Sequence, residues 1–229
     1  DGRVLALSQT DGQVLWQVQI GSPEWQFRVI IAGTVVSGDT VFVAVDRSLT
    51  ENNFQSTVVV VALDRQTGRE LWRYQYAGTD MATNHPPALA GGKLVIADGY
   101  TGYVLALDAA TGSQLWLQPV YGYMFAVPAV RGDTVFVATA SSRAYALDSR
   151  TGRVLWTAIT DGGASGVAPC GTEVFVQNFQ VELRRADNGH RVGLAFPRTD
   201  KEIATSGVTV AGRIAYVGTN KRLLALRCE

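Results

Sequence analysis

The sequence predicts an all-β fold, a β-propeller of four-stranded antiparallel blades with about five to six blades visible. Three observations support this prediction: a repeated segment, a second hairpin between its copies, and the lack of any convincing amphipathic helical pattern. The turn glycines of the repeated segment are 56, 44, 40 and 37 residues apart (Gly12, Gly68, Gly112, Gly152 and Gly189). This spacing suits blades of about 40–45 residues.

Each copy of the repeated segment reads as a β-hairpin. An apolar run meets an Asp-Gly or Thr-Gly turn and continues as a short apolar strand that ends in tryptophan. Glycine suits this turn because it adopts positive φ without steric cost. The four clear copies span residues 5–16, 61–72, 105–116 and 145–156, followed by a degenerate copy at 182–193 and a truncated one at 224–227.

A second hairpin lies between successive copies. Small and apolar residues lead to a glycine-containing turn, and an apolar strand such as residues 40–45 or 134–139 leaves it. Two hairpins per repeat make four strands per blade. We therefore expect one propeller domain over residues 1–229, with blade pieces at roughly 1–20, 28–75, 84–118, 125–158, 164–195 and 203–229.

The two ends of the chain predict an open arc. The chain starts with the second hairpin of a blade, which includes residues 4–7, and ends with a first hairpin plus one further strand at 223–226. These two strands occupy the same place in the repeat, so they do not fit into one blade. We expect an arc of a larger ring, with further blades supplied by a preceding part of the protein. The alternative is a ring of five blades in which residues 213–218 pair with 4–7.

The pattern Ala-x-Asp-x-x-Thr-Gly-x-x-x-Trp is complete at residues 62–72, 106–116 and 146–156, while the copy at 6–16 departs from it at two positions. It resembles the tryptophan-docking motif of the pyrroloquinoline-quinone-like repeat family, which comprises quinoprotein dehydrogenases and cofactor-free relatives. The chain is similar in character to the cofactor-free propeller lipoproteins of the outer-membrane β-barrel assembly machinery. The resemblance implies that each tryptophan lies flat between its own blade and the next blade's motif. The docking residues are then Trp16, Trp72, Trp116 and Trp156, with Gly12, Gly68, Gly112 and Gly152.

No catalytic, cofactor or metal site is expected. The quinoprotein dehydrogenases that the chain resembles use an adjacent-cysteine disulfide, a catalytic aspartate and calcium ligands, and this sequence has no adjacent cysteines. The two histidines, His85 and His190, are isolated and are interpreted as solvated loop residues. Cys170 and Cys228 lie 58 positions apart, and we expect two unpaired thiols, with a disulfide as the alternative.

Composition argues against two kinds of partner. Lysine plus arginine and aspartate plus glutamate both number 20, so the chain has no net charge to attract nucleic acid. No apolar stretch approaches the roughly 20 residues of a transmembrane helix. Anchoring by an N-terminal lipid outside this sequence is compatible with both observations.

A protein partner is expected on the face formed by the connections between blades. These connections hold most of the length variation and many aromatic residues, which favour protein binding. Alternatively, Phe125 and one tyrosine plug the mouth of the central channel. Residues 180–229 carry nine Lys and Arg against five acidic residues, which indicates either a basic patch for an acidic partner or a solvated face. The candidate binding residues are Trp25, Phe27, Phe54, Tyr121, Tyr123, Phe125, Arg184 and Arg185.

These observations predict a non-catalytic protein-binding scaffold or assembly factor outside the cytoplasm, in the periplasm or at the outer membrane of a bacterium. A ligand-sensing propeller domain of a larger receptor or kinase is the first alternative, and a subunit of a quinoprotein-type oxidoreductase is the second. A fused kinase or transmembrane segment would indicate the sensor, and quinone-dependent dye reduction would indicate the oxidoreductase.

Overall fold

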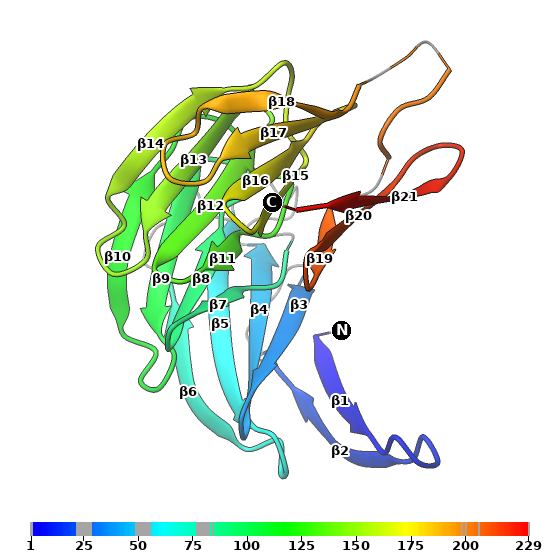
Figure 1. Ribbon diagram of the computed structural model, residues 1–229. Coiled ribbons are helices and arrows are strands. Elements are labelled where there is room, and N and C mark those ends of the chain that lie inside the picture. Colours follow the sequence, from blue (N-terminus) through cyan, green and yellow to red (C-terminus); the bar gives the residue numbers. More distant parts are fainter. Residues whose placement is uncertain are drawn as a thin grey trace.

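The protein folds into antiparallel β-sheets, and the part of the chain that the structure describes contains no helix (Figure 1). The structure is a computed structural model that describes residues 2–21, 29–48, 56–76, 83, 85–197, 199, 201–205 and 207–228. Within these ranges there is accordingly no helix long and apolar enough to cross a bilayer. The strands form six sheets, numbered here in chain order, in which every strand pairs with its neighbours in sequence.

The four central sheets have four strands each, and the first and sixth sheets have two and three. The first sheet contains β1 (Arg3–Leu7) and β2 (Val14–Gln19). The second contains β3 (Val29–Ser37), β4 (Thr40–Ser48), β5 (Ser56–Asp64) and β6 (Glu70–Gln75). The third contains β7 (Ala88–Ala90), β8 (Lys93–Ala97), β9 (Tyr103–Asp108) and β10 (Gln114–Pro119).

The fourth sheet contains β11 (Ala129–Arg131), β12 (Thr134–Thr139), β13 (Arg143–Asp148) and β14 (Val154–Ile159). The fifth contains β15 (Gly166–Cys170), β16 (Glu173–Gln177), β17 (Val181–Arg185) and β18 (Arg191–Phe196). The sixth contains β19 (Thr209–Ala211), β20 (Ile214–Gly218) and β21 (Leu223–Arg227).

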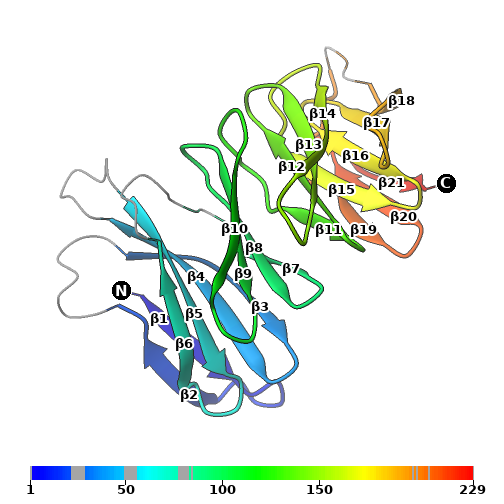
Figure 2. The same ribbon diagram turned by 90° about the vertical axis from the view of Figure 1, so that its left-hand side faces the viewer.

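The sheets follow one another in a curved row, with the first and sixth sheets at its two ends (Figures 1 and 2). The first strands of neighbouring sheets, β7, β11, β15 and β19, contact one another in this order and form the inner side of the row. The core lies between the sheets: Phe136 of β12, for example, packs with Val174 and Val176 of β16. Middle strands covered on both faces are largely apolar, as in β5, where residues 57–63 are all buried. This arrangement confirms the predicted propeller fold.

The strand pairing also decides between the two models of closure. β1 pairs only with β2, while β20 pairs with β19 and β21. The strands at residues 4–7 and 223–226 therefore lie in different sheets, and no described strand joins the sixth sheet to the first. The alternative of a closed five-blade ring is wrong for this chain. The larger ring stays a prediction.

The repeated Asp-x-x-Thr-Gly turn is held together by its own side chains. In the second sheet, Asp64 Oδ1 accepts hydrogen bonds from the Thr67 backbone N–H and hydroxyl, at 2.8 and 2.7 Å. The bond from the hydroxyl, followed by that from the backbone, lowers the pKa of Asp64 below its usual value. Gly68 then takes a φ of +72°, where a Cβ is unfavourable. Asp108 and Asp148 accept the same bonds in the next two sheets, so the sequence repeat gives a repeated local structure.

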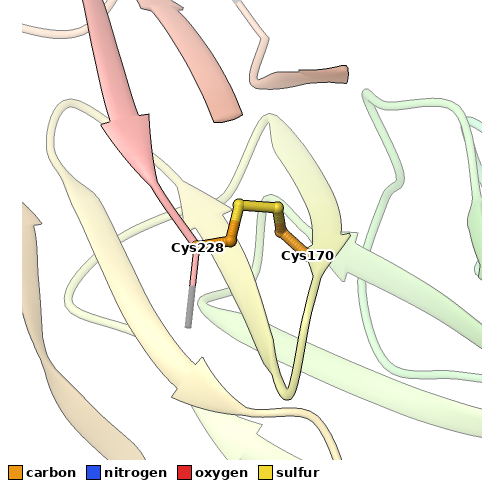
Figure 3. The surroundings of a disulfide bond; sticks show 2 residues. All are labelled: Cys170 and Cys228. Atoms are coloured by element: carbon orange, nitrogen blue, oxygen red, sulfur yellow. A yellow bond between two sulfur atoms is a disulfide. The ribbon is translucent and has the colours of Figure 1, made fainter. Parts of the chain in front are cut away.

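A disulfide joins Cys170, at the end of β15, to Cys228, directly after β21 (Figure 3). The expectation of two unpaired thiols is therefore wrong. The sixth sheet packs on the fifth and brings two residues 58 positions apart to a Cα–Cα distance of 5.6 Å, which is usual for a disulfide. The bond ties the last described strand to the inner strand of the preceding sheet.

Candidate functional site

Four tryptophans lie between consecutive sheets. The rings of Trp16, Trp72, Trp116 and Trp156 cover the turn glycines of the following sheet, namely Gly68, Gly112, Gly152 and Gly189. A Cβ on any of these glycines would stand 2.5–2.7 Å from the nearest ring atom, so each close approach depends on glycine. Each indole N–H donates to a backbone carbonyl of the next sheet's turn, at 2.9–3.1 Å. This geometry makes the four tryptophans structural.

Two details of the docking differ from the expectation. Trp116 and Trp156 are buried, but Trp72 is only partly buried, although its ring docks on the next turn in the same way. No described atom lies within 4 Å of the place where a Cβ on Gly12 would stand, so none of the described tryptophans covers this turn. Gly189 was missed as a docking glycine, although the Asn-Gly turn of the degenerate repeat was a usable signal.

An aromatic loop, residues 120–128, connects β10 to β11. Tyr121, Tyr123 and Phe125 are exposed by 66, 53 and 53%, while Val120 and Met124 between them are buried. The loop thus alternates between residues that anchor it to the core and aromatic rings that face outward. Exposed aromatic side chains on a loop of fixed conformation are typical of protein-binding surfaces.

Several contacts fix the conformation of the aromatic loop. The Tyr121 backbone N–H donates to the Tyr145 hydroxyl at 3.0 Å, and Tyr123 O accepts from the Ala140 N–H at 2.8 Å. The Arg143 guanidinium lies 5.2 Å from the centre of the Tyr121 ring, within the range of a cation–π contact. Gly122, at a φ of +101°, lies so close to Ser141 that a Cβ would clash. The loop backbone and the Tyr121 ring are therefore held in place before any partner binds.

The next connection, residues 160–165 between β14 and β15, provides an internal comparison. Both connections start in the same way, because Val120 N–H donates to Gly102 O and Thr160 N–H donates to Ser142 O, at 2.7 and 3.0 Å. The five residues that follow show the same order of exposure and burial in both. Where the aromatic loop has Tyr121, Tyr123 and Phe125, the 160–165 loop has Asp161, Gly163 and Ser165. The same order of exposure and burial therefore arises without aromatic residues, although Gly122 has a φ of +101° and the aligned Gly162 has no positive φ.

Two further exposed aromatic residues lie on the same face and were missed by the sequence analysis. Tyr100 lies in the β8–β9 turn, whose Gly102 accepts the hydrogen bond from Val120. Phe179 lies in the β16–β17 turn, where the Gln180 amide donates to Asp161 of the neighbouring connection at 2.9 Å. In the sequence, each is a single aromatic residue at the tip of a short turn, and this was the only pattern that could have indicated its exposure. Trp25, Phe27 and Phe54 lie outside the described residues.

Arg184 is not available to a partner, in contrast to the expectation. It is buried, and its guanidinium donates to Glu182 Oε2 at 3.1 and 2.7 Å and to Gly189 O at 3.0 Å. The pattern was misread because Arg184 stands on a core position of its strand. Arg185 is exposed as expected, with Asp187 Oδ1 at 4.0 Å from its Nε.

A cavity of about 280 Å³ lies where the chain enters the four inner strands β7, β11, β15 and β19. His85, Phe125, Val127, Ser165, Gly166 and Gly207 contribute to its wall. His85 is half-buried, which corrects its interpretation as a solvated residue, and this burial lowers the pKa of its imidazole. Phe125 both lines this cavity and stays half-exposed on the loop face, so it only partly covers the channel mouth.

The family model described as "Outer membrane protein assembly factor BamB" matches residues 56–228. The chain belongs to this family. The resemblance to the pyrroloquinoline-quinone-like propellers, and among them to the assembly factors, is thereby confirmed. The crystal structure of BamB from Moraxella catarrhalis has the same fold, with a TM-score of 0.71 over 99% of this chain and 67% of that one at 18% identity.

Individual relatives carry different functions. BamB of Nitrosomonas eutropha is 33% identical over 43% of this chain and 23% of its own length. Tetrathionate hydrolase of Acidithiobacillus ferrooxidans is 32% identical over 46% of this chain and 21% of its own length. The serine/threonine-protein kinase AfsK of Streptomyces griseus is 26% identical over 72% of this chain and 21% of its own length. In each case the chain spans less than a quarter of the relative's length.

No cluster of three or more His, Cys, Asp or Glu is placed to hold a metal ion among the described residues. His190 is exposed at a turn, and both cysteines are in the disulfide. The candidate site of this chain therefore consists of the aromatic loop and the cavity beside it.

Proposed function

We propose that this chain is the protein-binding propeller of an outer-membrane protein assembly factor, that it acts without catalysis outside the cytoplasm, and that the aromatic loop is its binding surface. The observation that carries the proposal is the difference between the aromatic loop and the 160–165 loop. Both have the same bonds at their start and the same order of burial, yet only one presents three aromatic rings to solvent. Family membership supplies the assembly role.

The disulfide supports a location outside the cytoplasm. Structural disulfides persist in oxidising compartments such as the bacterial periplasm and are rare in the cytosol. Both Cys170 and Cys228 are almost fully buried, which suits a permanent structural bond.

Protein isolated from its native compartment is accordingly expected to be fully oxidised. Denaturation without reductant, followed by a thiol-alkylating reagent and intact-mass measurement, should show no added alkyl group. A reduced and denatured sample should gain two such groups and serves as the control. Two alkyl groups without reductant would contradict the extracytoplasmic location.

The aromatic loop can be tested with residues taken from the 160–165 loop. The triple variant Tyr121→Asp, Tyr123→Gly, Phe125→Ser should keep the melting temperature within a few degrees, since it removes three exposed rings and leaves the buried Val120 and Met124 in place. A lost aromatic hot spot costs at least about 2 kcal/mol, so the Kd for the partner should rise by at least about 30-fold. Isothermal calorimetry with the purified partner measures this change.

The partner itself is identified by photo-crosslinking in the native bacterium. A photoreactive phenylalanine analogue at position 123 of the full-length protein should form adducts with a component of the outer-membrane protein assembly machinery, identified by mass spectrometry. The same analogue at Thr157, which is exposed on the outer strand β14, is the matched control. Adducts of equal yield at both positions, or unchanged affinity of the triple variant, would refute the proposed surface.

The match to kinase AfsK favours a second candidate, a sensor domain of a larger protein, because it covers 72% of this chain. The two candidates differ in what the aromatic loop binds. A sensor would bind a small molecule or signal peptide and need not crosslink to an assembly component. An oxidoreductase role has less support, because the cysteines are not adjacent in sequence and are bonded to one another across two sheets.

A further inference from the structure

The cavity of about 280 Å³ adjoins the aromatic loop, and Phe125 belongs to both. A cavity of about 150 Å³ suffices for benzene, so this cavity has room for a larger ring. Phe125 lies on the same loop as Tyr121 and Tyr123, so the cavity wall and the exposed rings share this loop. A side chain of a partner bound to the aromatic loop could therefore reach it.

The wall of the cavity selects against charged groups. It contains Phe125, Val127 and Val167 as apolar side chains, and no Asp, Glu, Lys or Arg among its described residues. Its one ionisable side chain among the described residues is His85, and burial lowers the pKa of this imidazole, which favours the neutral form. Transfer of a charge to such a site without an ionic partner is costly, so a neutral and largely apolar occupant is favoured.

One polar group at the wall lacks a hydrogen-bond partner. The Gln177 side chain is 3% exposed, and its Oε1 accepts no hydrogen bond. This oxygen lies 2.9 Å from the place where a Cβ on Gly166 would stand, and Gly166 lines the cavity. Gly166 has no side chain to lie between this oxygen and the cavity, and the Gly207 Cα is 3.5 Å from the same Cβ position. A donor that reaches Gly166 would satisfy a buried group that is costly to leave unpaired.

We propose that the cavity receives one aromatic side chain with a hydrogen-bond donor, a tryptophan or tyrosine, from the protein that binds the aromatic loop. The inference rests on the proposed function. The ring packs between Phe125 and the valines, and its N–H or O–H donates to Gln177 Oε1 past Gly166. Aromatic anchors in desolvated pockets carry much of the energy of protein interfaces.

Capped amino acids probe the cavity without the partner. N-acetyl-tryptophanamide and N-acetyl-tyrosinamide, titrated into the full chain and followed by two-dimensional NMR, should shift resonances around Gly166 and Gly207 in a saturable way. N-acetyl-phenylalaninamide should bind about 2–12-fold more weakly, the worth of one neutral hydrogen bond. N-acetyl-lysinamide should not bind. Equal affinity of the phenylalanine and tryptophan probes would overturn the role of Gln177.

Two variants test the geometry. A Cβ on Gly207 would meet no described atom within 4 Å, so Gly207→Leu adds a side chain at the cavity wall whose first carbon clashes with no described neighbour. It should abolish probe binding and raise the Kd for the partner at least about tenfold, as loss of an interface anchor does. Gly193→Leu, at an equally open position on β18, is the matched control and should change neither. Gln177→Leu should remove the preference for tryptophan over phenylalanine without lowering the melting temperature.

The outcomes separate this inference from the proposed function. If Gly207→Leu binds the partner and the probes normally while the triple variant of the aromatic loop does not bind the partner, the cavity has no anchoring role and the proposed surface stands. If both variants bind the partner normally, both proposals fail. Loss of probe binding in Gly207→Leu and in Gly193→Leu alike would show that the effect is not local, and would also overturn the inference.

Discussion

Replacing Trp116 with alanine is expected to lower the free energy of unfolding by about 3–5 kcal/mol, the usual range for large-to-small aromatic changes in cores. Trp116 is 7% exposed and packs with Val104 and Leu147 in the core between the third and fourth sheets. Its indole N–H donates to Ser149 O at 3.0 Å, so the truncation also removes a donor from that carbonyl. The truncation leaves a gap over Gly152, and this glycine has no side chain that could fill it.

Urea denaturation of the full chain measures this loss. Leu115→Ala is the matched control, because Leu115 precedes Trp116 on β10 but is 44% exposed, and its loss should cost about 1 kcal/mol or less. Trp116→Phe keeps an aromatic ring but not the N–H, and should fall between the two. Equal losses for Trp116→Ala and Leu115→Ala would contradict the docking role.

The docking of the tryptophans could be predicted from sequence because every component is local and repeated. Asp64, Thr67 and Gly68 form one turn through their own hydrogen bonds, and the same residues recur with the blade period. The resemblance to the docking motif then implies that the ring of one copy meets the glycine of the next. The partial exposure of Trp72, the uncovered Gly12 and the docking role of Gly189 were not predicted, because they depend on which sheets are neighbours and how they pack.

The disulfide and the buried arginine could not be predicted in the same way. Cys170 and Cys228 have no counterpart in the other repeats, so their proximity depends on how the sixth sheet packs on the fifth. Arg184 could have been placed with more care, since the aligned repeats have Leu107 and Leu147 at its position. A count of charges per segment places every charged side chain on the surface. The alignment of the repeats instead places Arg184 at a core position.

The candidate site was predicted only in part for a related reason. The aromatic cluster at Tyr121, Tyr123 and Phe125 is visible as a sequence pattern, but the cavity is not. Its wall comes from connections in four different sheets, for example His85, Ser165 and Gly207. Glycine and serine carry no sign of such a role in a sequence. The three-dimensional contact of the inner strands is needed to bring them together.

Glu182→Leu should lower the free energy of unfolding by about 3–5 kcal/mol, because removing one member of a buried ion pair leaves the other charge uncompensated. Glu182 is fully buried, and its Oε1 accepts from Asp161 N–H at 2.7 Å and from the Asn178 amide at 3.1 Å. Its Oε2 is the partner of Arg184, which also donates to Gly189 O under the Trp156 ring. The pair therefore links the fourth sheet to the fifth where tryptophan docking ends.

The double variant Glu182→Leu, Arg184→Leu should lose less stability than Glu182→Leu alone. The aligned repeats hold Leu105 and Leu107 in the third sheet and Tyr145 and Leu147 in the fourth, so apolar side chains suit both positions. Replacing a whole buried pair by packed apolar groups is often neutral or stabilising, although here Asp161 N–H and Gly189 O lose side-chain partners. A double-mutant cycle by urea denaturation should therefore give a coupling energy of about 2 kcal/mol or more between the two positions. Additive losses would mean that Glu182 and Arg184 act independently, each through its backbone contacts, and that the ion pair itself does not hold the two sheets together.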